Sequence, residues 1–148
     1  MRYKQLISLL FCTLCPILCD AMEWNEKTYH EIELSIRLPQ FGNNAYDVTT
    51  FGAKDNATPV QNQKAIQQAI ELCSQKGGGR VIIPAGTTLT TGAIHLKSHV
   101  NLVIEKGATL RFAFDPALYP IVETSWEGVD CYNLSPCIYA FQQTDIAI

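Results

Sequence analysis

The sequence predicts an all-β solenoid, a parallel β-helix, whose N-terminal end is closed by one amphipathic helix. Two observations predict this fold: short strand patterns recur at fixed spacings, and only one segment has the period of a helix. VIIPAGTTL (81–89) returns 21 residues later as LVIEKGATL (102–110), and 93–104 returns 44 residues later as 137–148. Short strands repeating every 20 to 25 residues or so are typical of a solenoid, whose coils bury their apolar residues only when stacked.

The alternation within these strands assigns side chains to two faces, because residues i and i+2 of a strand share a face. The expected inward side chains are Ile94, Leu96, Leu102, Ile104 and Leu110, and the outward ones are His95, Lys97, Asn101, Glu105 and Arg111. Gly86 and Gly107 hold equal positions at a corner, where a tight bend favours a residue without Cβ. A β-sandwich is the alternative, but it expects hairpin turns such as Asn-Gly, which the sequence lacks.

The expected helix spans residues 59–75. Thr58 is a suitable N-cap, Pro59 fits the first helical position, and Gly77 follows the last turn. Its apolar stripe consists of Ile66, Ala69, Ile70 and Cys73. Such a helix is suited to cover the open first coil of the solenoid. Elsewhere, the alternation of residues 32–38 predicts a strand, and residues 113–136 read as a loop.

The N-terminus has the pattern of a secretory signal at residues 1–21, with Arg2 and Lys4 before a short apolar run. A buried or membrane-anchoring segment is the alternative. We therefore expect export to the periplasm or the extracellular space, an N-terminal extension over 22–45, and a β-helix domain over 46–148. The mature chain would keep Cys73, Cys131 and Cys137. Cys131 and Cys137 are close enough in sequence to pair, and buried free thiols are the alternative.

The composition excludes several classes of partner. The net charge is −3, from 11 basic and 14 acidic residues, and the charges are scattered. A nucleic-acid partner would favour a basic stripe, and a lipid surface would favour a basic amphipathic helix. We expect neither partner, and no membrane association once the signal is removed. The Cys and His spacings do not suit a metal site, so no metal and no cofactor are expected.

The repeat segments also resemble a known family. Two segments, YDVTTFGAKDN (46–56) and ELCSQKGGGRVIIPAGTTLTTGAIHLKSHVNLVIEKGATLRF (71–112), resemble the entry segment of the pectate-lyase-type β-helix superfamily, most closely the polygalacturonase-type glycoside hydrolases of family 28. Residues 119–148 are similar to the next segment of the bacterial members of that family. The family often has Gly-Asp-Gly where this chain has Ala53-Lys54-Asp55-Asn56. The resemblance covers residues 46–148. It implies a right-handed parallel β-helix, a pectin or galacturonan substrate, inverting hydrolysis of α-1,4-galacturonan, and a monomer at full length.

The chemistry implied by the resemblance needs residues that the chain lacks. Inverting hydrolysis uses one carboxylic acid on the leaving oxygen and one carboxylate on the attacking water. The family's Asn-Thr-Asp, Asp-Asp, Gly-His-Gly and Arg-Ile-Lys motifs do not occur here. The last repeat stops at Ile148, inside a strand pattern. We therefore expect no catalytic residue in this chain, and an inactive N-terminal fragment of a longer enzyme.

Three residues are candidates for sugar contact. Trp126 and Glu127 lie in the segment read as a loop, where an aromatic face and a carboxylate can meet a sugar ring. Tyr139 has outward parity and could line a groove. The alternatives are a Trp that folds the loop onto the solenoid, a solvated acid and a packed surface tyrosine. For the whole chain, the alternative functions are a lyase or epimerase-like enzyme and a non-catalytic carbohydrate-binding or tail-spike-type β-helix.

Overall fold

The computed structural model describes residues 26–148, so the expected signal segment 1–21 lies outside the described residues. The chain divides into two units, residues 1–37 and 38–148, and each is described by itself. In the first unit, α2 spans Glu26–Ser35. No helix among the described residues is long and apolar enough to cross a membrane.

The strand predicted over residues 32–38 is wrong, because Ile32 to Ser35 belong to helix α2. The alternating side chains have no partner strand, and Ile32, Leu34 and Ile36 are exposed. Without a partner, strand hydrogen bonds are unmet, while a helix satisfies its own backbone. An ion pair between Lys27 and Glu31, with Nζ and Oε1 3.9 Å apart, matches the i, i+4 spacing of that helix.

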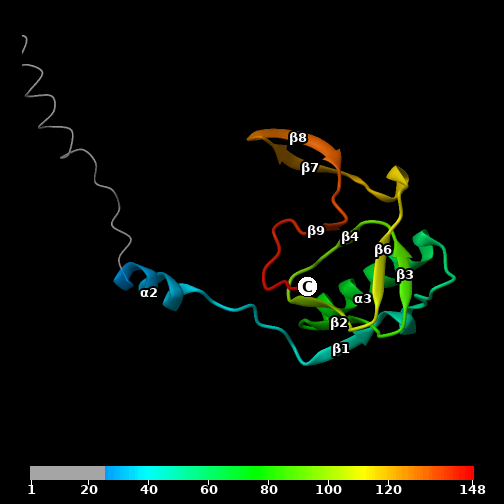
Figure 1. Cartoon of the computed structure of the whole chain (residues 1–148), viewed down its shortest axis with the longest axis horizontal. Helices are drawn as coiled ribbons and strands as arrows, with labels where there is room; N and C mark the ends of the chain where they lie inside the picture. Colours follow the sequence, from blue (N-terminus) through cyan, green and yellow to red (C-terminus); the bar gives the residue numbers. More distant parts are fainter. Residues whose placement is uncertain (1–25) are drawn as a thin grey trace, which may run out of the picture. The chain divides into compact units, whose positions relative to one another are not determined.

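The second unit is built from parallel strands stacked coil on coil (Figure 1). One sheet has the order β1-β2-β5, with β1 at Asn44–Asp47, β2 at Gly79–Ile83 and β5 at Val100–Ile104. The second sheet pairs β3 (Thr88–Thr91) with β6 (Thr109–Phe112), and the third pairs β4 (Ile94–His95) with β9 (Ile138–Tyr139). All pairs in these three sheets are parallel. This is the arrangement that the sequence repeat predicts.

The predicted repeat spacings are confirmed at the strands. Val81 lies opposite Leu102 and Thr88 opposite Thr109, each 21 residues apart. Ile94 lies opposite Ile138, 44 residues apart. The prediction that Leu102 matches Ile146 is wrong, because the bridge in that coil joins Asn101 to Ala147. The turn between β9 and this bridge therefore takes up two more residues than its counterpart in the coil below.

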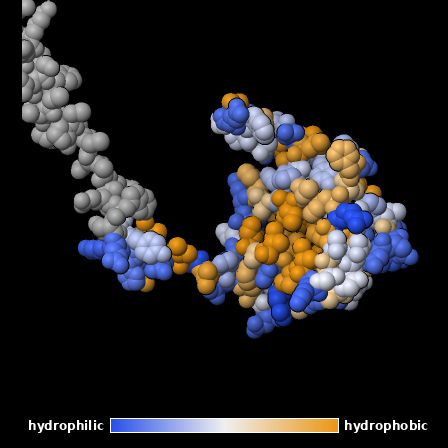
Figure 2. Space-filling model, viewed as in Figure 1, coloured by the Kyte–Doolittle hydropathy of each residue, from blue (hydrophilic) through white to orange (hydrophobic). Residues whose placement is uncertain are grey.

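The inward side of the strands forms the core. Ile94, Leu96 and Leu102 are buried as predicted, and Leu110 packs against them partly buried. Ile104 is the exception, with 39% of its surface exposed. It lies at the end of β5, whose outer edge meets only the isolated bridge at Asn101 among the described residues. On the side of the second unit drawn in Figure 2, apolar side chains gather in the middle.

The predicted helix is confirmed as α3, Pro59–Gln75. Thr58 caps it, with its side chain accepting from the Gln61 backbone N–H while the Gln61 side chain accepts from the Thr58 N–H. The stripe predicted from the sequence is fully buried against the strands. Because Gly77 has φ +86°, the chain leaves the helix in the left-handed region that glycine tolerates.

Amide side chains of α3 bind the edges of β3 and β4 that face away from their partner strands β6 and β9. Asn62 is fully buried; its Nδ2 donates to the carbonyls of Thr90 (3.0 Å) and Lys54 (3.1 Å), and its Oδ1 accepts from the Lys54 N–H. Gln67 accepts from the His95 N–H and donates to the His95 carbonyl, each at 3.0 Å. The edge of this coil is therefore satisfied by the helix, which explains how α3 closes the end of the solenoid.

One corner of the coils uses the left-handed backbone region in three successive layers. Gly79 pairs with Val100, so the residues before them, Gly78 and His99, lie one above the other. The bridge between Asn101 and Ala147 places Asp145 above His99 in the same way. The φ angles of Gly78, His99 and Asp145 are +85°, +65° and +51°. The His99 Nδ1 and Asp145 Oδ2 atoms are 3.3 Å apart, so the two upper layers are also joined through side chains. The two corner residues predicted from the sequence, Gly86 and Gly107, have φ +81° and +88°.

Residues 113–136 are not a loop throughout, as the sequence reading had it. They contain η3 (Pro116–Leu118) and an antiparallel hairpin of β7 (Ile121–Trp126) and β8 (Val129–Leu134) (Figure 1). The turn is Glu127-Gly128, with φ +50° and +83°, which suits a two-residue hairpin turn. Asn-Gly is one sequence for such a turn, and its absence did not exclude hairpins.

Candidate functional site

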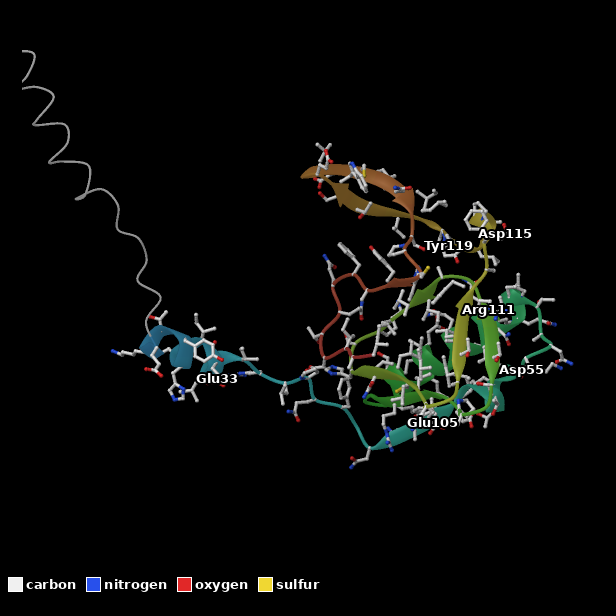
Figure 3. The ribbon with its side chains drawn as sticks, in the orientation of Figure 1. Glu33, Asp55, Glu105, Arg111, Asp115 and Tyr119 are labelled. Atoms are coloured by element: carbon white, nitrogen blue, oxygen red, sulfur yellow. The ribbon has the colours of Figure 1, made fainter. Side chains whose placement is uncertain are left out.

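Five carboxylates of the solenoid body accept hydrogen bonds from backbone amides. Asp55 accepts from the Thr88 N–H at 2.9 Å, and Glu105 accepts from the Ala85 N–H at 2.9 Å (Figure 3). The other backbone acceptors of this kind are Asp47, Asp115 and Asp145. These carboxylates hold turns in place, because a charged acceptor satisfies an otherwise unpaired amide.

The remaining acids of the second unit are Glu71 on α3 and three on the hairpin, Glu123, Glu127 and Asp130. Between Tyr119 and Pro136 the chain has no lysine or arginine, so the hairpin is uniformly acidic. A group of three or more His, Cys, Asp or Glu side chains suited to a metal is absent from the described residues.

The predicted contacts Trp126 and Glu127 lie together at the tip of the hairpin. Trp126 is the last residue of β7, pairs with Val129 and is 68% exposed, so it does not fold the segment onto the solenoid. Glu127 is the first turn residue. The indole face is open to a ligand, while the acidic surroundings repel an anionic one.

Tyr139 lies on a different sheet, in β9, where it pairs with His95 of β4. Their ring centroids are 5.3 Å apart with planes inclined by 58°. His95 is not the plain surface residue that its outward parity suggested. It is half-buried, and its Nε2 is enclosed without a hydrogen-bond partner. Burial, and to a lesser degree the charge of Lys97, lower the pKa of His95, so its ring is neutral at pH 7.

Next to His95 is a groove of about 470 Å³ between α3 and β4. The strand side contributes three positions of one parity, which are Ala93, His95 and Lys97. The helix side contributes its polar row, and Pro120 forms part of the wall. The helix residues are Val60, Gln63, Lys64, Gln67, Gln68 and Glu71. Spacings of three and four along the helix place this row on one side.

The floor of the groove is held by hydrogen bonds. Gln63 Nε2 donates to the carbonyls of Ala93 (2.8 Å) and Leu118 (3.1 Å), and Gln67 binds the backbone of His95 on both sides. Position 92 requires glycine, because a Cβ there would lie 2.7 Å from both Gln63 Oε1 and Leu118 Cβ. The helix and the strand are therefore fixed relative to each other.

The three cysteines of the described residues are free thiols. Cys73 is buried on the core-facing side of α3, and burial raises its pKa. Cys131 lies in β8 and Cys137 is exposed before β9, so the pairing that their spacing allows is not formed. Tyr119 donates to the Ala113 carbonyl at 2.7 Å (Figure 3). Its pKa is raised by burial and, secondarily, by Cys137.

The chain is similar to known proteins over part of its length. No family model matches it. It is 42% identical over 74 residues to an exo-poly-alpha-D-galacturonosidase of Dickeya chrysanthemi, covering 50% of this chain and 12% of that protein. It is 37% identical over 87 residues to plasmin and fibronectin-binding protein A of Streptococcus pneumoniae, covering 57% and 12%. The chain thus spans about an eighth of the length of these relatives.

Two solved structures are similar over more of the chain. A hyperthermoactive exopolygalacturonase from Thermotoga maritima matches with a TM-score of 0.71 and 35% identity, covering 81% of this chain and 27% of that one. A family 28 exopolygalacturonase from Yersinia enterocolitica matches with a TM-score of 0.59 and 37% identity, covering 68% and 17%. The chain is similar to a part of the exopolygalacturonases. This agrees with the family 28 resemblance of its repeats.

The sequence reading did not identify the groove. Its residues come from a helix and a strand about 30 positions apart in sequence, and the period of either element alone does not show that they meet. The available signal was the run of glutamines at 61, 63, 67 and 68 on the polar face of the helix, together with the outward parity of His95 and Lys97. From the sequence, the polar face of the helix had no assigned role, and His95 and Lys97 had only an outward parity.

Proposed function

We propose that this chain is the N-terminal part of a secreted pectin-degrading glycoside hydrolase of the family 28 polygalacturonase type, with a right-handed β-helix. The observation that carries the proposal is the match to the Thermotoga maritima exopolygalacturonase, at 35% identity over 81% of this chain. Because the match covers 27% of that enzyme, the activity belongs to a longer protein. The named relatives and neighbours of this type act as exo-enzymes, which favours an exo mode here.

The reaction we propose is inverting hydrolysis of α-1,4-galacturonan. One carboxylic acid protonates the leaving oxygen, and a second carboxylate takes a proton from the attacking water on the other side of the sugar. Five body carboxylates of this chain hold backbone amides instead. We place the catalytic pair in further coils, and we propose that this segment alone is inactive and closes the N-terminal end of the solenoid. The full-length enzyme would be a monomer without a cofactor.

The test starts with the coding sequence beyond codon 148. We expect further coils that contain an Asp-Asp pair and a Gly-His-Gly segment. The extended protein and the 148-residue chain are then assayed on polygalacturonate, with reducing ends and unsaturated products measured in parallel. Hydrolase activity gives new reducing ends without absorbance from a double bond. An unsaturated product would contradict hydrolysis and indicate a lyase, and turnover by the short chain would contradict the assignment of the catalytic pair to further coils.

A second candidate is a binding function without catalysis. It is favoured by the similarity to plasmin and fibronectin-binding protein A, at 37% identity over 57% of this chain. The hairpin β7–β8 is an exposed surface in keeping with it, since Trp126, Val129 and Tyr132 are each more than 60% exposed. The measurement is surface plasmon resonance of the purified chain against immobilised plasmin and fibronectin. Absence of binding to both at micromolar concentrations removes this candidate.

For localisation, we propose export through the signal segment at residues 1–21. The support is the sequence pattern described above, a basic start followed by an apolar run. N-terminal sequencing of the protein recovered from a bacterial host should give a mature chain that begins near residue 22 in the periplasm or medium. Recovery of an uncleaved, cytoplasmic chain would contradict export.

A further inference from the structure

The groove between α3 and β4 contains side chains that the fold does not use. Lys64, Gln68 and Glu71 have no hydrogen-bond or ion-pair partner among residues 26–148. They line the same groove as Lys97 and His95, and its floor is fixed by glutamine–backbone hydrogen bonds. Small-molecule sites are largely preformed and hold their ligand through a few placed polar groups, and about 470 Å³ is within their range of roughly 300–1,000 Å³.

The charges in this groove select the sign of the ligand. Lys64 and Lys97 contribute two positive charges and Glu71 one negative charge. His95 stays neutral at pH 7 because its pKa is lowered. The groove therefore has a net positive charge on a chain whose net charge is −3. A ligand with a carboxylate is attracted here and repelled at the acidic hairpin, since fields of opposite sign act at the two places.

The other groups in the groove suit a hydroxylated ring. Gln68 offers both donors and an acceptor, and Glu71 accepts from hydroxyl groups. Val60 and Pro120 supply small apolar surfaces. Beyond His95, the ring of Tyr139 continues the same outward face at 5.3 Å between ring centroids. The amides, the acid and the cations of the groove, with the aromatic ring that adjoins it at His95, match the mixed surface of a sugar acid.

We infer that this groove binds uronic acid units of an acidic polysaccharide, with the sugar carboxylate near Lys64 and Lys97 and the hydroxyl groups toward Gln68 and Glu71. The identity of the sugar rests on the proposed function, whereas the preference for a hydroxylated anion rests on the groove itself. The groove would be a binding site apart from the catalytic pair. It would hold the polymer at the capped end of the solenoid.

The test is a titration of the full chain, labelled with ¹⁵N, with digalacturonate and with its dimethyl ester, which has the same rings without charge. Digalacturonate should shift the backbone amide signals of Gln67, His95 and Lys97, and the ester should bind more weakly. Lys97→Gln and Lys64→Gln should each weaken binding of digalacturonate by roughly two- to five-fold, as for an exposed charge pair. Lys106→Gln, at an exposed corner outside the groove, is the matched control and should leave binding unchanged.

Each result decides the inference. Shifts that map to the groove and decrease in the Lys97 and Lys64 variants support it. It is overturned by the absence of shifts up to about 20 mM ligand, by equal binding of the ester, or by shifts confined to the hairpin. The result is independent of the hydrolase assay, because it uses binding to this chain alone. Groove binding with no hydrolysis by the extended protein would remove the proposed enzyme and keep the site.

Discussion

The close contact between coils at Gly78 can be tested with two neighbouring glycines that share a backbone conformation. Gly77 and Gly78 have φ angles of +86° and +85°. A Cβ on Gly77 would have no atom within 4 Å, whereas a Cβ on Gly78 would lie 2.5 Å from both the Cβ and the carbonyl oxygen of His99. Alanine at each position therefore has the same backbone strain, and only the Gly78 variant forces the two coils apart.

The expected free energies follow from these contacts. The left-handed conformation destabilises Gly77→Ala by about 1–2 kcal/mol. Gly78→Ala adds overpacking of roughly 1–3 kcal/mol. It also strains the hydrogen bond from the Gly79 N–H to the His99 carbonyl, now 2.9 Å long and worth about 1 kcal/mol. We expect Gly78→Ala to lower the free energy of unfolding by roughly 2–4 kcal/mol more than Gly77→Ala, since the strain term is common to both.

The assay is urea unfolding followed by far-UV circular dichroism, with wild type and both variants at the same protein concentration. The free energies of unfolding should differ between the variants while the slope with urea stays the same. If Gly78→Ala does not fold, the double variant with His99→Gly, which removes one of the two clashing atoms, should recover part of the stability. Equal destabilisation of the two single variants, within about 0.5 kcal/mol, would refute the packing of Gly78 against His99.

Three further predictions concern the helix and the groove. Asn62→Ala should lower the free energy of unfolding by about 3 kcal/mol, because it removes three buried hydrogen bonds to Lys54 and Thr90. The control in the same urea assay is Gln68→Ala on the exposed face of the helix, which should change the free energy of unfolding by less than about 0.5 kcal/mol. Thr58→Ala should cost about 1 kcal/mol through loss of the N-cap, measured as a lower thermal midpoint, and an unchanged midpoint would contradict the capping role. The pKa of His95 is lowered below 6.5 in the folded state, so the unfolded chain takes up the proton first as the pH falls, and stability decreases below that value. The wild type should therefore lose more stability than His95→Gln between about pH 7.5 and pH 5, and parallel curves would contradict this assignment.

The architecture was predictable because its determinants repeat along the sequence. A spacing of 21 residues between equal strand patterns gives the register of Val81 on Leu102 directly, since parallel coils stack equivalent positions. The helix was predictable because Thr58, Pro59 and Gly77 are local signals for its two ends. These features depend on neighbours in sequence or on copies at one period. No tertiary information is needed to find them.

The sequence pattern did not predict three features, because each depends on a pairing partner or a turn conformation that the pattern does not show. Residues 32–38 alternate as a strand would, yet no strand pairs with them, and Ile32 to Ser35 are helical. The hairpin β7–β8 forms through Glu127-Gly128, a turn less recognisable than Asn-Gly. The shift from 44 to 46 residues arises between Tyr139 and Ala147, where Gln142 has φ +53°, a conformation that a glutamine does not signal in the sequence.

The two candidate surfaces, the hairpin tip and the groove beside His95, differ in charge, which the sequence pattern alone does not show. Trp126 and Glu127 were selected by residue type, as an aromatic ring and an acid in one segment, and they remain predictions. Their hairpin adds Glu123 and Asp130 and has no positive charge, so a polyanion approaching its tip meets like charges. The groove beside His95 presents Lys64 and Lys97 on fixed elements. A polyanion is therefore favoured by charge at the groove over the hairpin, where the indole face of Trp126 is the surface without charge that it could contact.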